Sequence, residues 1–541
     1  MALSGRLLVA VFCLLALLLL TVNYLYVYRF GHELSSLVTQ DGSQKTATAD
    51  VPAAATGEIE YERGREEGYN QEEDGWCANV AGQHYLTNVA NTWTISCPPA
   101  AGGKALIVCF QANLEEQPDN FCVVKNAVYN PPETPAPAKR KPVERRPKNS
   151  TTPAASYRWN GNRERRRRDP NGPNGHGWSV ACRLVGEWQH GVQAPRNFPH
   201  YFGWTGAGPQ LHKIQMGGGS EKSIGEEEKE CHPPIMLVQL EGNGNIWHTM
   251  MEMWSALLTI EILKRAKAAR EAIGLTTGTE GGEWDGTDMQ VYMENMASEM
   301  HISPIFDLWR LVTGRPPANT TSLAHGCYQA VILPLAGGAN PFWKDHWRER
   351  TCRSPSLLDS FVDRVLSFYG VDDATSSSPS ISHVQGSNRE SAPMRVTVIA
   401  RDHNRVILHL HAYLKALRIA FPAAEISSES LESLTVSQQL RLAQSTDVLI
   451  GVTGAGLTHT MFLRRGSAVV ELLQPWPFMY YGFANVARMR GVEYLSLHGR
   501  EIGIADAAKN WQLDDIDVSE EAFVDTVGRA INAVQRRRLA G

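Results

Sequence analysis

The sequence predicts an α/β protein with two parallel-sheet domains behind an N-terminal transmembrane helix. Apolar strand-like runs alternate with segments of helical periodicity on both sides of a Ser-rich stretch, residues 374–393, and such alternation is typical of parallel sheets. The chain has 541 residues, of which 43% are hydrophobic and 20% charged, so it can form ordinary hydrophobic cores. An uncharged run from Leu7 to Tyr28 is long enough to cross a membrane.

The N-terminal run has the length of a membrane span and exceeds that of a cleaved signal. Arg6 and Arg29 close it. A helix rises ~1.5 Å per residue and must cross a ~30 Å hydrocarbon core, whereas a cleaved signal has an apolar region of ~7 to 15 residues. We therefore expect a single-pass type II membrane anchor, with the rest of the chain lumenal. A long cleaved signal peptide is the alternative.

The cysteines are consistent with a lumenal body. Cys13 lies in the apolar run, and an even number remains, which permits disulfides in an oxidising compartment without revealing their pairing. These cysteines are Cys77, Cys97, Cys109, Cys122, Cys182, Cys231, Cys327 and Cys352. No two of them form a C-x-x-C pair, which argues against a zinc ribbon or a thioredoxin-type site. The N-glycosylation sequons Asn149-Ser150-Thr151 and Asn319-Thr320-Thr321 agree with the same compartment.

Charge and composition divide the chain further. The formal net charge of -5 argues against a dedicated nucleic-acid binder, which needs an excess of Lys and Arg. The Arg-rich run 163–168 lies in a Pro-rich stretch and predicts a solvated insertion, with nucleic-acid or nuclear targeting as the alternative.

The predicted parts are an anchor (1–30), a stem (31–75), a cysteine-bearing segment (76–130), a disordered insertion (131–177), a first α/β domain (178–373), a linker (374–393) and a second α/β domain (394–541).

Hydrophobic periodicity predicts the individual elements. In the cysteine-bearing segment we expect strands over 105–110 and 121–125. In the first domain we expect strands over 235–240, 289–293 and 329–335 and helices over 246–272, 305–312 and 357–369. In the second domain we expect strands over 395–400, 447–452, 468–473 and 493–497 and helices over 406–420, 436–443, 456–463 and 478–489.

A glycine turn in the second domain is the sharpest local motif. The strand 447–452 runs into Thr453-Gly454-Ala455-Gly456 and then Leu457-Thr458-His459, where a helix is expected to open. Backbone N–H groups at such a point can bind a phosphate, and small residues allow its oxygens to approach. The motif is neither the dinucleotide fingerprint nor a Walker loop. A tight turn with purely structural glycines is an equally good interpretation.

Three charged residues frame this turn. Arg401 and Arg405 follow the strand 395–400, and Glu471 lies in the strand 468–473. Since ligands of open parallel sheets bind beyond the carboxyl ends of strands, the arginines could neutralise a diphosphate and Glu471 could hold a ribose. Surface ion pairs for the arginines and a strand-edge carboxylate for Glu471 are the alternatives.

A second cluster begins the helix 246–272. Asn245 precedes that helix, and His248 and Glu252 lie one turn apart, away from the apolar stripe. Glu252 could orient His248, or either residue could act as a general base. A surface i,i+4 pair is the alternative.

Together these segments resemble glycosyltransferase family 61, in particular its EGF-domain-specific O-linked N-acetylglucosamine transferase branch. The likeness runs from about Met236 to His498. It is carried by Asn245-Ile246-Trp247-His248, Arg395-Val396-Thr397-Val398-Ile399-Ala400-Arg401, Gln439-Leu440-Arg441, Gly454-Ala455-Gly456-Leu457-Thr458-His459, Val470-Glu471-Leu472 and Ala487-Arg488-Met489-Arg490-Gly491-Val492.

The resemblance implies a GT-B architecture, in which two Rossmann-like domains face each other across a cleft. It also implies an inverting transfer of N-acetylglucosamine from UDP-N-acetylglucosamine to Ser or Thr of secretory proteins, without a metal or another cofactor. Gly454, Ala455, Gly456, Thr458 and His459 would cradle the diphosphate. Arg401 and Arg405 would offset its charge, Glu471 would hold the ribose, and Asn245 would contact substrate. His248 or Glu252 would be the base.

Two residues depart from the family pattern. Thr453 stands where the family commonly has His, and Glu252 stands where the animal enzymes of this branch have Asp. A UDP-xylose-dependent polysaccharide xylosyltransferase and a catalytically silent lectin-like or scaffold protein are the alternative functions. The one Asp-x-Asp sequence, Asp515-Ile516-Asp517, is interpreted as solvated charge.

Overall fold

The structure is a computed structural model. It describes residues 71–100, 103–112, 119–131, 177–182, 207–211, 214–216, 230–240, 245–275, 284–294, 304–344, 346–371, 392–475, 480–500 and 514–540. All of them lie within one compact unit, Tyr69–Gly541. The predicted anchor and nearly all of the predicted stem, insertion and linker lie outside the described residues. Within the described part, no helix is both long and apolar enough to cross a membrane.

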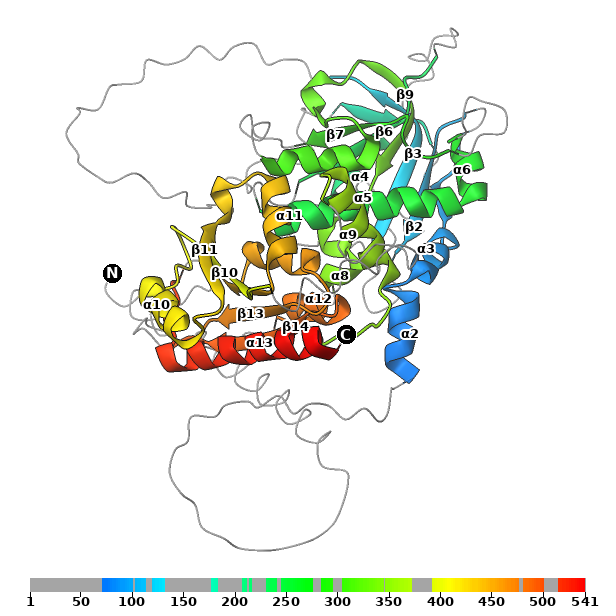
Figure 1. Ribbon diagram of the computed structural model, residues 1–541. Coiled ribbons are helices and arrows are strands. Elements are labelled where there is room, and N and C mark those ends of the chain that lie inside the picture. The colour runs from blue at the N-terminus through cyan, green and yellow to red at the C-terminus, as the bar shows by residue number, and fades with distance from the viewer. Residues whose placement is uncertain are drawn as a thin grey trace, which may run out of the picture. The chain divides into compact units, whose positions relative to one another are not determined.

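The first half is built on a nine-stranded mixed sheet (Figure 1). Its strands are β1 (Thr94–Cys97), β2 (Leu106–Gln111), β3 (Asn120–Tyr129), β4 (Trp178–Val180), β5 (Gln215–Met216), β6 (Ile235–Gln239), β7 (Gln290–Glu294), β8 (Ala318–Asn319) and β9 (Gly326–Leu333). The main order is β1-β2-β3-β9-β6-β7-β8, while β4 pairs with β3 and β5. The strands β9, β6, β7 and β8 are parallel, as predicted.

The antiparallel part of this sheet corrects the expectation of a purely parallel domain. The strands β1, β2 and β3 pair antiparallel, and β3 joins β9 antiparallel. The physical reason is connection length, since β2 and β3 are joined by a short loop, whereas parallel neighbours need a long crossover. The cysteine-bearing segment therefore contributes strands to the same sheet as β6 and β9.

The helices of this half are α2 (Gln71–Asn79), α3 (Gln83–Ala90), α4 (Ala207–Leu211), α5 (Ile246–Arg265), α6 (Lys267–Ile273), η4 (Pro304–Trp309), α7 (Arg310–Thr313), η5 (Thr320–Ser322), η6 (Gly337–Ala339), α8 (Pro341–Lys344) and α9 (Ser356–Phe368). The helix predicted over 246–272 is interrupted, because Ala266 has a ψ of 61° and a new helix starts after it. The helix predicted over 305–312 is a 3-10 helix that continues into the short α7.

The second half is an all-parallel five-stranded sheet in the order β11-β10-β12-β13-β14. Its strands are β10 (Arg395–Ala400), β11 (Glu425–Ser430), β12 (Val448–Val452), β13 (Ala468–Leu473) and β14 (Glu493–His498). Its helices are α10 (Leu410–Ala420), η7 (Leu431–Ser433), α11 (Val436–Ser445), η8 (Ala455–Phe462), α12 (Gly482–Met489) and α13 (Glu520–Ala540). The parallel sheet predicted for this half is confirmed, and α13 packs along β13 and β14 (Figure 1).

Two interpretations of the second half need correction. The edge strand β11 has the polar sequence EISSES and therefore shows no apolar run. Asp515-Ile516-Asp517 is not solvated charge. The Val406 N–H donates to Asp515 Oδ1 at 2.9 Å, the Tyr413 hydroxyl donates to Asp517 Oδ1 at 3.0 Å, and Ile516 is buried. These carboxylates bind residues 515–517 to α10 and to the segment that precedes it.

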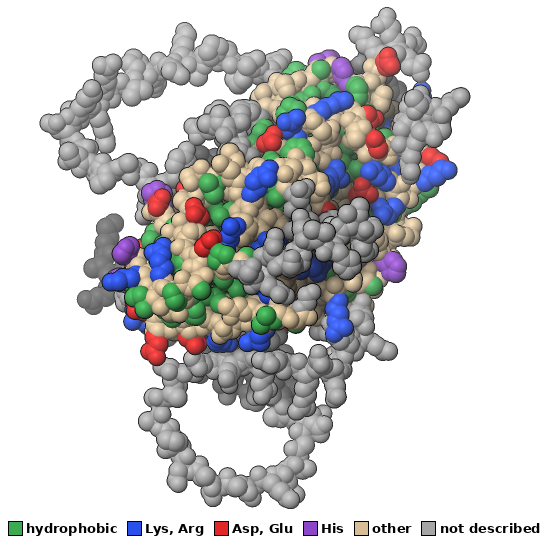
Figure 2. Space-filling view, viewed as in Figure 1, with side chains coloured by type: hydrophobic (Ala, Val, Ile, Leu, Met, Phe, Trp, Pro, Cys, Tyr) green, Lys and Arg blue, Asp and Glu red, His purple; other side chains and the backbone are tan. Residues whose placement is uncertain are grey.

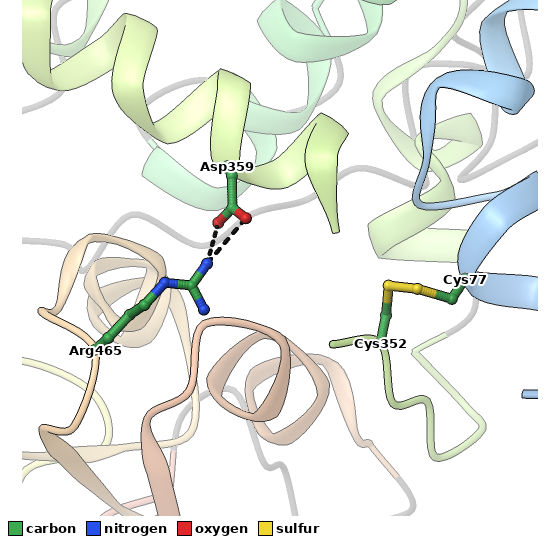
Figure 3. Close-up of a disulfide and its surroundings, with 4 residues drawn as sticks. All are labelled: Cys77, Cys352, Asp359 and Arg465. Atoms are coloured by element: carbon green, nitrogen blue, oxygen red, sulfur yellow. Dashed lines mark hydrogen bonds and ion pairs between the residues drawn. A yellow bond between two sulfur atoms is a disulfide. The ribbon is translucent and has the colours of Figure 1, made fainter. Parts of the chain in front are cut away.

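Four disulfides pair the eight cysteines beyond Cys13, which confirms the prediction of disulfides. They join Cys77 to Cys352, Cys97 to Cys182, Cys109 to Cys122, and Cys231 to Cys327. Figure 3 shows the first of these connecting α2 to the segment before α9. Figure 2 shows acidic and basic side chains interspersed on the described surface.

Each half has a hydrophobic core of its own, and one further core spans both halves. It contains residues of α5 and α9 from the first half together with residues of η8 and α12 from the second. Ring contact between Trp247 of α5 and Phe483 of α12, with centroids 5.2 Å apart, lies at this junction. The start of α5 is thereby held against α12, and α5 also packs directly against η8, the helix that follows the glycine turn.

Candidate functional site

The centre of the parallel sheet contains a point where strand order reverses. From β10 the chain moves to β11 on one side and then returns to β12 on the other side of β10. Arg401 follows the carboxyl end of β10, and Thr453 follows the carboxyl end of β12, which pairs with β10. Ligands of open parallel sheets bind at such a reversal, so the two predicted donor-binding segments meet where this topology places a ligand.

The turn after β12 depends on glycine. Gly454 has φ 147° and ψ −170°, a conformation that is essentially restricted to glycine. A Cβ on Gly454 would lie 2.2 Å from Arg405 Nη1, and one on Gly451 would lie 3.0 Å from Leu457 Cδ2. Gly454, Ala455 and Gly456 are half-exposed, so this backbone lies at the surface. The helix that follows is 3-10 rather than α-helical, and its first N–H groups have no intrahelical acceptor.

Two arginines flank the turn. The Arg405 Nη1 donates to the Thr453 carbonyl oxygen at 2.7 Å, and Arg401 Nε donates to the Asn404 carbonyl oxygen at 3.0 Å. Burial, with the nearby positive charge of Arg401, lowers the pKa of Arg405 to about 10, so its guanidinium group stays charged at neutral pH. The paired positive charges beside exposed backbone favour an anion.

Two predicted contact residues point into the interior. Thr458 Oγ1 donates to the Ala455 carbonyl oxygen at 2.6 Å, and His459 Nδ1 lies 2.9 Å from the Gly456 carbonyl oxygen. Both side chains are buried, and burial lowers the pKa of His459. They stabilise the first turn of η8, whereas the backbone before them faces outward.

Glu471 lies beneath the turn in β13. Its side chain is 0% exposed, and the Tyr494 hydroxyl donates to its Oε2 at 2.8 Å. Burial raises the pKa of Glu471 to about 7. The strand-edge interpretation is therefore wrong, because β13 lies between β12 and β14 and the carboxyl group is enclosed.

The start of α5 presents a neutral histidine. Asn245 is the N-cap, and its Oδ1 accepts from the N–H groups of Trp247 at 3.0 Å and His248 at 3.4 Å. Burial lowers the pKa of His248 to about 4, so its imidazole is neutral at physiological pH. Its Nδ1 is buried and has no hydrogen-bond partner among the described residues, and its ring lies edge-on to Trp343 with centroids 4.6 Å apart.

Glu252 lies one turn further along α5 and is 4% exposed. The expected apolar stripe of α5 is buried as predicted, but the remaining faces are buried too, because α3, η4, η6, α7 and η8 surround the helix. The interpretation of His248 and Glu252 as a surface pair is therefore wrong. Glu252 lies in the interior, and His248 is half-buried with its Nδ1 enclosed.

Several neighbours of these residues escaped sequence reasoning. They are Trp343, His346, Tyr480, Phe483 and Tyr494. Tyr494 could have been found, because Ser496 pairs with Glu471, and the period of two then places Tyr494 on the same face. The aromatic contacts had no such signal, since they join segments that are distant in sequence. Among the described residues, no group of three or more His, Cys, Asp or Glu side chains could hold a metal ion.

The family model described as Glycosyltransferase 61 matches residues 246–470. This segment begins with α5 and includes β10, both arginines and the whole glycine turn, and it ends one residue before Glu471. Residues 246–470 form a glycosyltransferase 61 domain. The resemblance identified from the residues is thereby confirmed.

Similar proteins support this assignment. The chain is 33% identical over 334 residues to the EGF domain-specific O-linked N-acetylglucosamine transferase of Drosophila melanogaster. The aligned region covers 61% of this chain and 56% of the relative. Its likeness to the proteins of the same name from Bos taurus (36%) and Mus musculus (34%) extends over 147 residues, 27% of this chain and 25% of each relative. The chain thus matches between a quarter and just over half of the length of these relatives. The glycosyltransferase 61 domain is the part to which a function can be attached.

Proposed function

We propose that this protein is an inverting glycosyltransferase that transfers N-acetylglucosamine from UDP-N-acetylglucosamine to Ser or Thr hydroxyls of secretory-pathway proteins. One observation carries the proposal. The Gly454 turn and the two arginines occupy the strand-order reversal of the parallel sheet, and α5 with His248 packs against the helix that leaves this turn. The two halves would act as the two Rossmann-like domains of a GT-B enzyme with a cleft between them.

The donor's diphosphate would bind at the exposed backbone of Gly454, Ala455 and Gly456. Helix N-termini attract anions through unpaired N–H groups and the helix dipole, and Arg401 and Arg405 would offset the remaining charge. Glu471 would hold the ribose, and Tyr494 would orient its carboxyl group through their 2.8 Å hydrogen bond. Because Glu471 is enclosed, this contact requires the side chain to become accessible when donor binds.

On the acceptor side, His248 or Glu252 would act as the general base. The acceptor oxygen would form a bond to the anomeric carbon while the bond from that carbon to UDP breaks on the opposite face. The leaving diphosphate takes the bonding electrons, and the base takes the hydroxyl proton. The His248 imidazole is neutral and therefore has a nitrogen that can accept a proton. Asn245 fixes the position of His248 by capping α5.

The sugar and the acceptor are proposed from the relatives, whose name is EGF domain-specific O-linked N-acetylglucosamine transferase. The chain is further proposed to be a type II protein of the endoplasmic reticulum or Golgi membrane that works without a metal or another cofactor. Four disulfides support an oxidising compartment. Thr453, in place of the family His, is the observation that favours the silent-fold alternative.

Donor binding and transfer by the purified full-length chain test this proposal. We expect UDP-N-acetylglucosamine, well above its Kd, to stabilise the fold by a few kcal/mol in a thermal shift assay, with or without a chelator. We also expect transfer to a folded EGF-like domain. Stabilisation by UDP-xylose alone would move the assignment to a polysaccharide xylosyltransferase. If no UDP-sugar shifts the Tm of folded protein, the transferase assignment fails and the silent fold replaces it.

A further inference from the structure

An edge of the first sheet ends in a glycosylation sequon. The two-residue strand β8 lies at the end of the main strand order, and Asn319 is its last residue. Asn319 and Thr321 belong to the sequon Asn319-Thr320-Thr321, in which the middle residue is not proline. Asn319 is half-exposed and Thr321 is exposed.

The local turn uses atoms other than the one that glycosylation modifies. The Thr321 N–H donates to Asn319 Oδ1 at 2.9 Å, and Ser322 Oγ donates to the Asn319 carbonyl oxygen at 2.7 Å. The amide nitrogen Nδ2 is not part of either hydrogen bond. A glycan on Nδ2 is therefore compatible with the folded turn.

We propose that Asn319 carries an N-linked glycan. In this reaction Nδ2 of Asn319 forms a bond to the first sugar of a lipid-diphosphate-linked oligosaccharide. The bond between that sugar and the diphosphate breaks, the amide loses one proton, and the lipid diphosphate leaves with the bonding electrons. The four disulfides place the folding of this chain in the kind of compartment where this modification occurs.

The position has a structural consequence. Exposed edge strands present unpaired backbone groups that can pair with other chains, and proteins protect such edges in several ways. A bulky, hydrated glycan at the end of β8 shields this edge. The inference is independent of the proposed transferase activity, because it concerns a modification of this chain and not a reaction that it catalyses.

The competing explanation is that Asn319 is present only to form the turn, and the structure supplies variants that separate the two. Thr321→Ala destroys the sequon but keeps the backbone N–H that donates to Asn319. Thr321→Ser preserves both the sequon and this backbone hydrogen bond. Asn319→Gln removes both the sequon and the side chain that accepts this hydrogen bond, and Asn149→Gln removes the other sequon and leaves the residues of β8 unchanged.

The full chain and these variants would be produced in a eukaryotic secretory host, treated with an N-glycosidase and mapped by mass spectrometry. We expect glycosidase treatment to convert Asn319 to Asp in the wild-type, Thr321→Ser and Asn149→Gln proteins. We expect Thr321→Ala and Asn319→Gln to lose one glycan, with Thr321→Ala retaining the wild-type Tm once both proteins are deglycosylated. An unmodified Asn319 peptide in folded wild-type protein, or a Thr321→Ala variant with unchanged mass, would overturn the proposal.

Discussion

Arg490, the residue after α12, and Asp359 of α9 form an ion pair across the junction of the two halves, and the Arg490 side chain is only 2% exposed. Arg490 Nε also donates to the Met461 carbonyl oxygen at 3.0 Å. Arg465 forms a second ion pair with Asp359, with its Nη2 2.9 Å from Asp359 Oδ2 (Figure 3). The carboxylate thus holds two arginines of the second half against a helix of the first, next to the core that supports the candidate site.

Asp359→Asn should destabilise the protein strongly. The Arg490 guanidinium is buried while Asp359 is 28% exposed, so removing the carboxylate should cost more than the loss of an exposed pair and at most the about 3 to 5 kcal/mol of a fully buried one. Arg465→Gln is the matched control, because Arg465 is 42% exposed and its pair contributes about 1 kcal/mol or less. Free energies of unfolding from urea titrations would measure both. Equal losses in the two variants would contradict the dominance of the buried pair.

Gly454→Ala should weaken binding of a UDP-sugar at least about tenfold, a loss of about 1.4 kcal/mol. The new Cβ would displace Arg405 and strain a backbone conformation that suits glycine. Gly466→Ala is a control at another glycine of positive φ, 84°, where the atom nearest to the new Cβ is 3.9 Å away. Calorimetric titration should therefore show loss of donor affinity in the first variant and near-normal affinity in the second. Normal donor affinity in Gly454→Ala would exclude the turn from the donor site.

Glu471 should make stability depend on pH in a defined direction. Its pKa rises from 4.5 to about 7 on folding. Its contribution to the free energy of unfolding is therefore fully present below pH 4.5 and is lost as pH rises through 7. Relative to Glu471→Gln, the wild-type protein should lose roughly 3 kcal/mol of unfolding free energy between pH 4.5 and 8. Parallel urea titrations of the two proteins measure this difference.

Tyr494→Phe provides an internal check on that dependence. The hydrogen bond from Tyr494 stabilises the ionised carboxylate and opposes the rise in the pKa of Glu471. Its removal should move the pH window of the stability loss upward. A window that moves downward, or a wild-type protein that gains stability over Glu471→Gln as pH rises, would refute the burial-driven shift.

His248→Ala and Glu252→Ala should separate catalysis from donor binding. If one of them is the general base, its loss should lower kcat about 10²- to 10⁴-fold while the donor Kd stays close to the wild-type value. His411→Ala, on the exposed face of α10, is the control for a histidine replacement. Steady-state kinetics with calorimetric donor titration would show the split. Unchanged kcat in both α5 variants would remove the base from this helix.

Local sequence was sufficient to predict most of the second sheet. The strands β10, β12 and β13 lie within one residue of their predicted bounds, because each is a short apolar run closed by turn residues. The polar β11 was missed, since a strand at the sheet edge needs no apolar run. The mixed first sheet was only partly predicted, because antiparallel pairing between β3 and β9 joins segments about 200 residues apart.

The sequence by itself determined most strands of the second sheet, the glycine turn beside two arginines, the pairing potential of the cysteines and the family of the domain. These properties reside in short segments, where apolar period, residue size and motif spacing act locally. Tertiary structure alone decided which cysteines pair, that Glu252 and Glu471 are buried, and that the His248 imidazole is neutral. The physical reason is that burial and pKa depend on how many distant segments surround a side chain. Periodicity along one helix or strand does not predict which distant segments will pack there.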